Sequence, residues 1–182
     1  MLTVILTGGS SRRMGKDKAA LPLAGKTMAL YIAERYRELG PVAFSVNRRG
    51  RFPAGEYREL VDRYPGCGPM NGLLSAFLET EEGVIFLTAA DMPAGEPMAV
   101  RYLLERLGQH DACLFAGEPL FGVYRRSCLP AAERCMEEGI YSLRSFLARI
   151  DALELPAEGP EFLINLNTPA EYEAFINRRA KS

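Results

Sequence analysis

The chain has 182 residues, of which 48% are hydrophobic and 25% charged, and its net charge is −1. This composition supports one packed domain rather than a disordered chain, and the near-neutral charge argues against a nucleic-acid-binding protein, whose surface is usually basic. We expect no membrane partner either, because no apolar stretch reaches the roughly 20 residues of a membrane span and the N-terminus lacks the features of a signal peptide.

The first half of the chain predicts alternating strands and helices. Short apolar runs rich in β-branched residues indicate strands, and longer runs with an apolar stripe indicate helices. The strands are expected at 2–7, 42–46, 60–61 and 84–87. The helices are expected at 28–39, from residue 68 onward and at 96–107. This order favours a mainly parallel sheet with helices on both faces.

The alternation changes after residue 107. Two strands are expected at 112–116 and 120–124, two helices at 127–138 and 142–150, and short strands at 152–155 and 162–166. Thr168 and Pro169 have the residue types of an N-cap and a first helical turn, so they predict the start of a last helix. The predicted fold class is therefore α/β: a single three-layer α/β/α domain over residues 1–182, with a mostly parallel mixed sheet of Rossmann type.

The cysteines do not form a recognisable framework. The four cysteines show neither paired C-x-x-C spacing nor the spacing of a zinc site, and the chain has a single histidine. Scattered cysteines in a chain of this length are typical of a reducing compartment. We therefore expect a cytoplasmic protein whose cysteines are structural or incidental.

The segment after the first strand has the composition of a phosphate site. The strand ends at Gly8 and Gly9, where the backbone amides are bare and the chain is free to turn. Four cations follow within seven residues: Arg12, Arg13, Lys16 and Lys18. A basic surface loop is the alternative, but it gives no reason for two glycines at a strand end. The pattern fits neither a P-loop nor a dinucleotide fingerprint, so it predicts another kind of polyphosphate site.

The same segment resembles a known signature. Residues 6–9 and 12–18 are similar to the pattern L-A-G-G-x-x-R-R-M-G-x-D-K of the molybdenum cofactor guanylyltransferases. These enzymes are nucleotidyltransferases with a glycosyltransferase-A-like fold. The only departure from the pattern is Thr7, which replaces alanine. Related enzymes that use CTP usually carry Ala-Gly where this chain has Gly8 and Gly9. The resemblance therefore favours GTP as the nucleotide.

Polar residues follow three of the predicted strands. Asn47, Asp62 and Asp91 lie where ligands bind in open α/β sheets, outside the carboxyl ends of the strands. Each alone is also a common turn residue. Asp91 is the most prominent, because it directly follows an apolar strand and because carboxylates are preferred ligands of Mg²⁺. We therefore expect Asp91 to anchor Mg²⁺, with Mn²⁺ as the alternative cation.

The resemblance assigns nucleotide binding to the first half of the chain, residues 1–95. Asp91 matches the metal-binding aspartate of the family pattern C-D-x-P, with Ala90 in place of cysteine. Asn47 and Asp62 match positions that contact guanine or ribose. The resemblance implies that Arg13, Lys18 and Asp91 are catalytic. The implied nucleotide-binding set is Leu6, Thr7, Gly8, Gly9, Lys18, Asn47, Asp62 and Asp91.

The second half, residues 96–182, is the implied acceptor-binding half. Ser142–Leu147 matches a helix that borders the pterin site of the family, where Arg144 would meet an anionic phosphate. Residues 162–169 resemble F-x-N-x-N-T-P, and Asn165 and Asn167 are expected to leave a strand on one face. Helix capping alone is an alternative reason for Asn167. The implied acceptor-binding residues are Arg144, Asn165 and Asn167.

The reaction implied by the resemblance is attack of the terminal phosphate of molybdopterin, with or without molybdenum, on the α-phosphorus of GTP. Transient contacts with proteins that deliver the cofactor and with molybdoenzymes are a family expectation. The alternatives within the fold are a CTP-using cytidylyltransferase and a transferase that activates a sugar or alcohol phosphate. An alternative of another class is a non-catalytic sensor that binds GTP.

Overall fold

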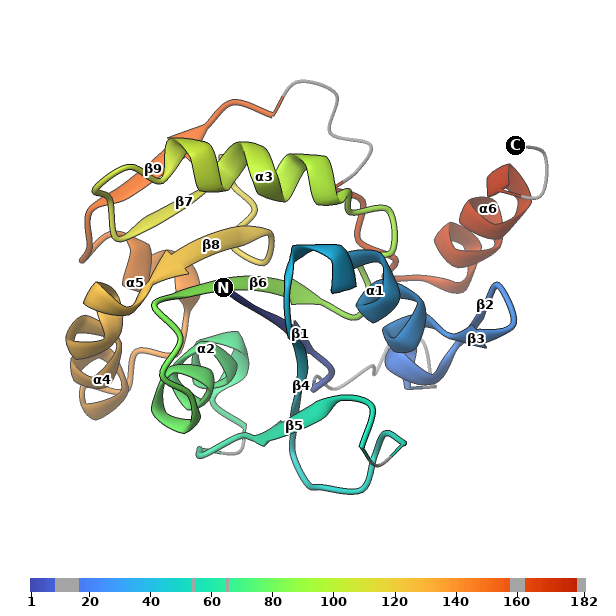
Figure 1. Cartoon of the computed structure of the whole chain (residues 1–182), viewed down its shortest axis with the longest axis horizontal. Helices are drawn as coiled ribbons and strands as arrows, with labels where there is room; N and C mark the ends of the chain where they lie inside the picture. The colour runs from blue at the N-terminus through green and yellow to red at the C-terminus, as the bar shows by residue number, and fades with distance from the viewer. Residues whose placement is uncertain (9–16, 54, 65, 158–162, 180–182) are drawn as a thin grey trace.

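A computed structural model describes residues 1–8, 17–53, 55–64, 66–157 and 163–179. Its centre is a 7-stranded sheet in the order β5-β4-β1-β6-β8-β7-β9 (Figure 1). β5, β4, β1 and β6 are mutually parallel, β8 is antiparallel to β6 and β7, and β7 is parallel to β9. Because β8 is inverted between them, β7 runs in the same direction as β6. The predicted mixed, mostly parallel sheet is confirmed.

The strands of the main sheet are mostly apolar on both faces, as expected for a sheet covered by helices. They are β1 (Leu2–Leu6), β4 (Val42–Val46), β5 (Arg58–Val61), β6 (Val84–Ala89), β7 (Ala112–Phe115), β8 (Gly122–Arg125) and β9 (Ala152–Leu155). A second sheet is the small antiparallel hairpin of β2 (Pro22–Leu23) and β3 (Lys26–Thr27). In β1, Ile5 packs toward one core, whereas Val4 and Leu6 pack toward the other, which follows the period of two in a strand.

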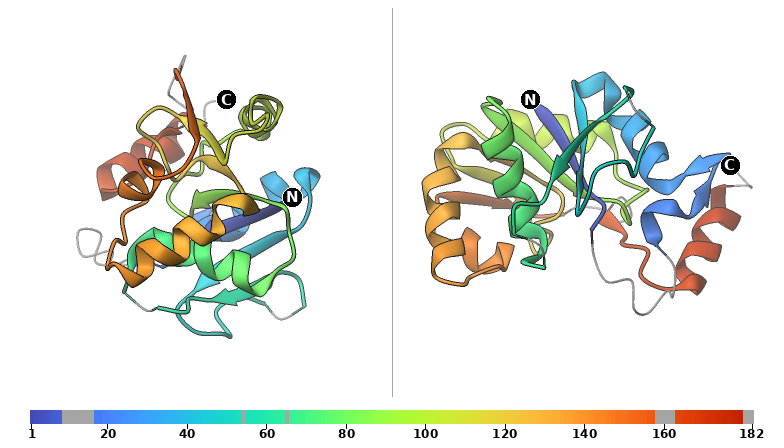
Figure 2. Two further views of the ribbon diagram at one scale, coloured as in Figure 1. Left: turned by 90° about the vertical axis from the view of Figure 1, so that its left-hand side faces the viewer. Right: turned by 90° about the horizontal axis from the view of Figure 1, so that it is seen from below.

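Helices cover both faces of the sheet (Figure 2). The first core packs α1 (Met28–Tyr36) and α3 (Pro97–Arg106) against the sheet, and the second packs α2 (Gly68–Glu79), α4 (Leu129–Glu137) and α5 (Leu143–Leu147). The 3₁₀ turns are η1 (Lys18–Ala20), η2 (Arg37–Leu39) and η3 (Arg126–Cys128). The last helix, α6 (Pro169–Arg179), lies beside the β2–β3 hairpin in both figures, and the Tyr172 hydroxyl donates to the Pro22 carbonyl.

One predicted element is wrong. The strand expected at 162–166 is absent from its described part, 163–166, which has no ladder partner. Leu163 and Leu166 are buried against the first core, three residues apart, while the backbone amide of Leu166 donates to the Asp91 carbonyl at 2.8 Å. The segment is therefore an irregular connection held by the carboxyl end of β6, and residue 162 lies outside the described residues.

Gly72 sets how closely α2 approaches the sheet. A Cβ atom at this position would lie 2.3 Å from Leu6 Cδ2 and 2.9 Å from Ser45 Oγ. We expect Gly72→Ala to destabilise the fold by about 1–3 kcal/mol in urea unfolding, because overpacking forces the neighbours to shift. Gly83→Ala is the matched control, since no atom lies within 4 Å of its Cβ position. Equal stability of the two variants would contradict the packing argument.

Within the described part of the chain, no helix is both long and apolar enough to cross a membrane.

Candidate active site

Lys18, Asp91 and Asn167 meet at the carboxyl edge of the sheet. Lys18 Nζ lies 2.8 Å from Asp91 Oδ2 and 2.7 Å from Asn167 Oδ1, so one ammonium group is held between two oxygen atoms from distant parts of the chain. The side chains of Lys18 and Asp91 are only 17% and 20% exposed. Three residues that the sequence assigned separately to nucleotide, metal and acceptor binding therefore form one cluster.

The local chain explains why these groups are held in place. Lys18 begins the 3₁₀ turn η1, whose N-cap is Asp17: its carboxylate accepts from the Ala19 amide at 3.1 Å. Asp91 is the second residue after β6, and its carbonyl accepts a hydrogen bond from the Leu166 amide. Asn167 precedes α6, whose first turn is fixed by a capping box between Thr168 and Glu171. The Glu171 amide donates to Thr168 Oγ1 at 3.2 Å. In return, the Glu171 carboxylate accepts from the Thr168 amide at 2.9 Å. The predicted N-cap role of Thr168 is confirmed.

Asn47 and Asp62 lie together on the other side of the β1 terminus. A Cβ atom built on Gly8 would lie 3.4 Å from Asn47 Oδ1 and 3.7 Å from Asp62 Oδ2. Ser45 Oγ donates to Asp62 Oδ1 at 2.6 Å. Burial raises the pKa of Asp62, and the Ser45 hydrogen bond acts against this rise. The structure therefore brings Asn47 and Asp62 close to Gly8 at the end of β1, at the edge where the sequence predicted them.

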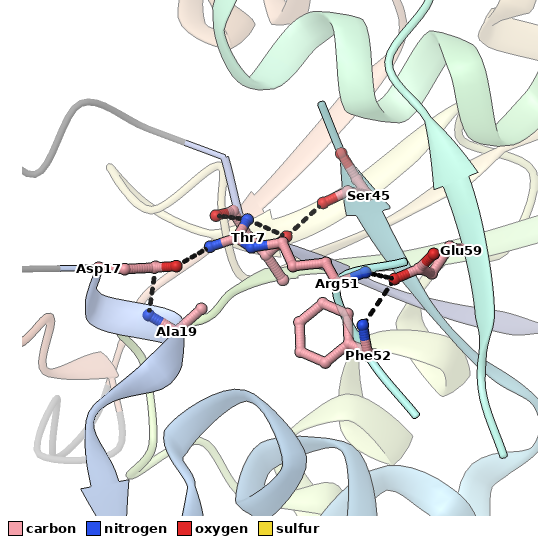
Figure 3. A network of polar contacts seen from close by, with 7 residues as sticks. All are labelled: Thr7, Asp17, Ala19, Ser45, Arg51, Phe52 and Glu59. Carbon is pink, nitrogen blue, oxygen red and sulfur yellow. Dashed lines mark hydrogen bonds and ion pairs between the residues drawn. The ribbon is translucent and has the colours of Figure 1, made fainter. Parts of the chain in front are cut away.

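A polar network joins Thr7, Arg51 and Asp17 (Figure 3). Arg51 Nη1 donates to the Thr7 carbonyl at 2.7 Å and to Thr7 Oγ1 at 2.9 Å, while Nη2 pairs with the Asp17 carboxylate. Thr7 Oγ1 in turn donates to the Ser45 carbonyl at 2.6 Å. One guanidinium group thus links the end of β1 to the residue before Lys18.

The turn that carries Arg51 is itself fixed from β5. The carboxylate of Glu59 accepts from the backbone amides of Gly50, Arg51 and Phe52 at 2.6, 2.7 and 2.8 Å. Figure 3 shows the contacts of Glu59 with Arg51 and Phe52. Desolvation acts to raise the pKa of Glu59, but these three hydrogen bonds, together with the charge of Arg49, lower this pKa overall. The Phe52 ring stacks on Phe44 with centroids 3.8 Å apart.

The sequence analysis missed Arg51. The only sequence signal is the run Arg48, Arg49 and Arg51 directly after Asn47, which is compatible with a solvated turn. We expect Arg51→Met to weaken GTP binding about tenfold, because Thr7 and Asp17 flank residues 8–16 and lose charged hydrogen bonds worth about 1.5–3 kcal/mol each before solvent screening. Calorimetric titration with GTP measures the effect. Arg101→Met is the control, since that exposed arginine pairs with Glu38 away from this network, and equal GTP affinity in both variants would contradict the role of Arg51.

The second half of the chain contributes a separate group of polar residues. Asn165 Nδ2 donates to Glu118 Oε2 at 3.1 Å, and Arg144 Nη2 donates to the Gly117 carbonyl at 3.1 Å. Arg144 is exposed, whereas Glu118 and Asn165 are half-buried. The structure thus places Asn165 and Asn167 on different partners, Glu118 and Lys18, rather than on one face of a strand. Glu118 is a second residue of this edge that the sequence analysis did not assign to a site.

Gly9 and Arg13 were also predicted as site residues and lie outside the described residues. The described portion contains no group of three or more His, Cys, Asp or Glu side chains able to hold a metal. The metal expectation therefore rests on Asp91 with a non-acidic companion. The four cysteines are free; Cys113, Cys128 and Cys135 are buried and Cys67 is half-buried.

Comparisons with known proteins agree with this architecture. Residues 3–154 match the model of the MobA-like NTP transferase domain. A relative from Carboxydothermus hydrogenoformans named "Probable molybdenum cofactor guanylyltransferase" is 30% identical over 96% of this chain and 95% of its own length. A relative of the same name from Opitutus terrae is 32% identical, covering 92% of this chain and 90% of its own.

A solved structure has the same fold. The molybdopterin-guanine dinucleotide biosynthesis protein A from Archaeoglobus fulgidus superimposes with a TM-score of 0.84 over 100% of both chains at 24% identity. The 2-C-methyl-D-erythritol 4-phosphate cytidylyltransferase from Thermus thermophilus has a TM-score of 0.74 at 12% identity, covering 98% of each chain. Because the family model matches residues 3–154 and a relative is 32% identical over 92% of this chain, the chain belongs to the MobA-like nucleotidyltransferases.

Proposed function

We propose that this enzyme transfers GMP from GTP to the terminal phosphate of molybdopterin, with or without molybdenum bound, and releases pyrophosphate. The observation that carries the proposal is the Lys18 ammonium group held between Asp91 and Asn167 at the edge where nucleotides bind in such sheets. The name of the full-length relatives, "Probable molybdenum cofactor guanylyltransferase", supports a guanylyl donor and a molybdenum-cofactor acceptor.

The residues present fit Mg²⁺, with Mn²⁺ as the alternative. Asp91 Oδ2 and Asn167 Oδ1 already converge on one cationic atom, Lys18 Nζ. Both are hard oxygen donors, and Mg²⁺ in nucleotide enzymes is held by one or two such ligands together with phosphate oxygens. When bound, the ion supplies neutralisation of charge on the phosphates. Asp91 and Asn167 would hold it, and Lys18 would donate instead to triphosphate oxygens.

The nucleotide-binding half, residues 1–95, would hold guanosine beside Gly8. Asn47 Oδ1 and Asp62 Oδ2 both face the space above this glycine. A carboxylate accepts two hydrogen bonds side by side, which suits the ring N–H and 2-amino group of guanine. The backbone of Leu6, Thr7, Gly8 and Gly9 would receive the phosphates, and Arg13 would assist Lys18.

The acceptor-binding half, residues 96–182, would place the attacking phosphate, with Arg144, Asn165 and Asn167 lining its approach. An oxygen of the acceptor phosphate bonds to the α-phosphorus of GTP, the bond from that phosphorus to the bridging oxygen breaks, and the electron pair leaves with pyrophosphate. The acceptor is already an anion near neutral pH, so the reaction depends on positioning and charge neutralisation rather than on a strong base.

Calorimetric titration with GTP, CTP and ATP, each with and without Mg²⁺, tests the nucleotide assignment. Tight binding of GTP alone is the expected result. Preference for CTP would move the product to the cytosine dinucleotide and contradict the guanylyl assignment. GTP binding without pyrophosphate release in the presence of molybdopterin would instead favour a nucleotide sensor, and release with a sugar phosphate or alcohol phosphate acceptor would replace the pterin substrate.

A further inference from the structure

We infer that the Glu118 carboxylate recognises the pterin ring of the acceptor by accepting hydrogen bonds from its ring N–H and 2-amino group. This inference rests on the proposed function. It starts from a chemical symmetry of the reaction, because guanine and pterin both carry a 2-amino-4-oxopyrimidine edge. An enzyme that joins two such molecules needs a matching acceptor of hydrogen bonds on each side of the reacting phosphates.

The sheet topology places one half-buried carboxylate on each side. Asp91 follows β6, near the middle of the sheet; Asp62 follows β5, three strands away on one side, and Glu118 follows β7, two strands away on the other. All three strands run in the same direction, so the three residues follow the same edge. Two strand spacings are roughly 10 Å, a span suited to a small substrate whose phosphate lies near Asp91.

The surroundings of Glu118 parallel those of Asp62. Asp62 is held by one neutral side-chain donor, the Ser45 hydroxyl at 2.6 Å, and Glu118 is held by another, the Asn165 amide at 3.1 Å. Burial raises the pKa of both carboxyl groups. Two hydrogen bonds, from Asn165 and from the Leu120 amide, lower the pKa of Glu118. The charge of Asp91 raises this pKa further, and the charge of Arg144 lowers it.

Glu118 also has the rigidity and free acceptor capacity that recognition needs. Its amide donates to the Phe115 carbonyl at 3.0 Å and its carbonyl accepts from Phe121 at 3.1 Å, so the backbone is fixed on both sides. Arg144 holds the preceding Gly117 carbonyl at 3.1 Å. A carboxylate has about four lone-pair sites, and the Asn165 and Leu120 donors take two of them. Within the part of the chain that the structure describes, two sites therefore remain for a pair of parallel donors.

The segment 165–167 connects this carboxylate to the reacting centre. Asn165 contacts Glu118, the Leu166 amide contacts the Asp91 carbonyl, and Asn167 contacts Lys18. Three consecutive residues thus fix the position of Glu118 relative to Lys18 and Asp91. A pterin bound at Glu118 would therefore have a defined position relative to the phosphates.

Glu118→Gln tests the inference, because glutamine keeps the size of the side chain but replaces one acceptor with a donor. The probe is 6-hydroxymethylpterin, which fluoresces and lacks the phosphate needed for turnover, titrated with saturating MgGTP present to fill the guanine site. The comparison ligand is 6-hydroxymethyllumazine, which has a carbonyl in place of the 2-amino group. The matched control is Glu154→Gln, since the Glu154 carboxylate contacts the Gly117 amide at 3.3 Å and has the same charge.

The wild-type enzyme is expected to prefer the pterin over the lumazine. Glu118→Gln should weaken pterin binding about 10- to 100-fold, as expected for hydrogen bonds to a charged group, and abolish the preference, with the KM for GTP within about twofold of wild type. Glu154→Gln should bind both ligands like wild type. Unchanged pterin binding in Glu118→Gln, equal loss in Glu154→Gln, or no pterin preference in wild type would overturn the inference.

Steady-state kinetics of GMP transfer to molybdopterin distinguish failure of this inference from failure of the proposed function. If wild type forms the guanine dinucleotide and Glu118→Gln has an unchanged KM for molybdopterin, only the role of Glu118 is overturned. If wild type forms no dinucleotide from GTP and molybdopterin, the proposed function itself fails.

Discussion

Asp91→Asn is expected to lower kcat for GMP transfer by about a thousandfold or more while leaving the fold intact. The side chain keeps its size, but its charge is lost at the point where it pairs with Lys18. Charge stabilisation by a bound metal is worth several kcal/mol, and each 1.4 kcal/mol is a factor of ten in rate. Pyrophosphate release measured over a range of Mg²⁺ concentrations shows the effect.

The control for this variant is Asp151→Asn. Asp151 is an exposed carboxylate that contacts His110; it directly precedes β9 and lies away from the nucleotide edge. It should keep wild-type kcat and wild-type dependence on Mg²⁺. Near-normal turnover of Asp91→Asn at any Mg²⁺ concentration would contradict the proposed roles of Asp91 in Mg²⁺ binding and in catalysis.

Lys18→Met is expected to lower kcat/KM for GTP by about 100- to 1,000-fold, the range seen when one donor to a developing negative charge is removed. Methionine keeps the length of the side chain but cannot donate to phosphate oxygens. It also leaves Asp91 and Asn167 without the ammonium group that joins them. Initial rates at varied GTP concentrations measure the loss.

Lys26→Met is the matched control, because this exposed lysine lies on β3 and pairs with Glu34 on α1. It should retain wild-type kcat/KM. A comparable loss in both variants would mean that net charge, and not the position of Lys18, determines activity. Circular dichroism during thermal unfolding verifies that both variants are folded.

Periodicity predicted most of the fold, and strand-end chemistry predicted which residues lie at the edge of the sheet that carries the candidate site. Buried runs such as Val84–Ala89 are strands because they are apolar on both faces, and parallel strands necessarily bring the residues that follow them to one edge. This is why the sequence could place Asp62 and Asp91 at the same edge of the sheet. Their individual contacts, such as that of Asp62 with Ser45, depend on register and could not be predicted in this way.

The residues that sequence reasoning missed are held by contacts distant in the chain. Arg51 reaches Thr7 across 44 residues, and Glu118 reaches Asn165 across 47. No local pattern shows such pairs. The wrong strand at 162–166 has a related cause: Asn165 and Asn167 alternate with apolar residues as in a strand, but their neighbour Leu166 donates its amide to Asp91 and not to a ladder.

Product analysis after mixing the enzyme with MgGTP and molybdopterin tests the central claim most directly. The expected result is one pyrophosphate released for each guanine dinucleotide formed, with CTP a poor substitute and with product formation by Asp91→Asn slowed by about a thousandfold or more. Release of pyrophosphate without the dinucleotide, or preferential formation of the cytosine dinucleotide, would contradict the assignment of this enzyme as a guanylyltransferase.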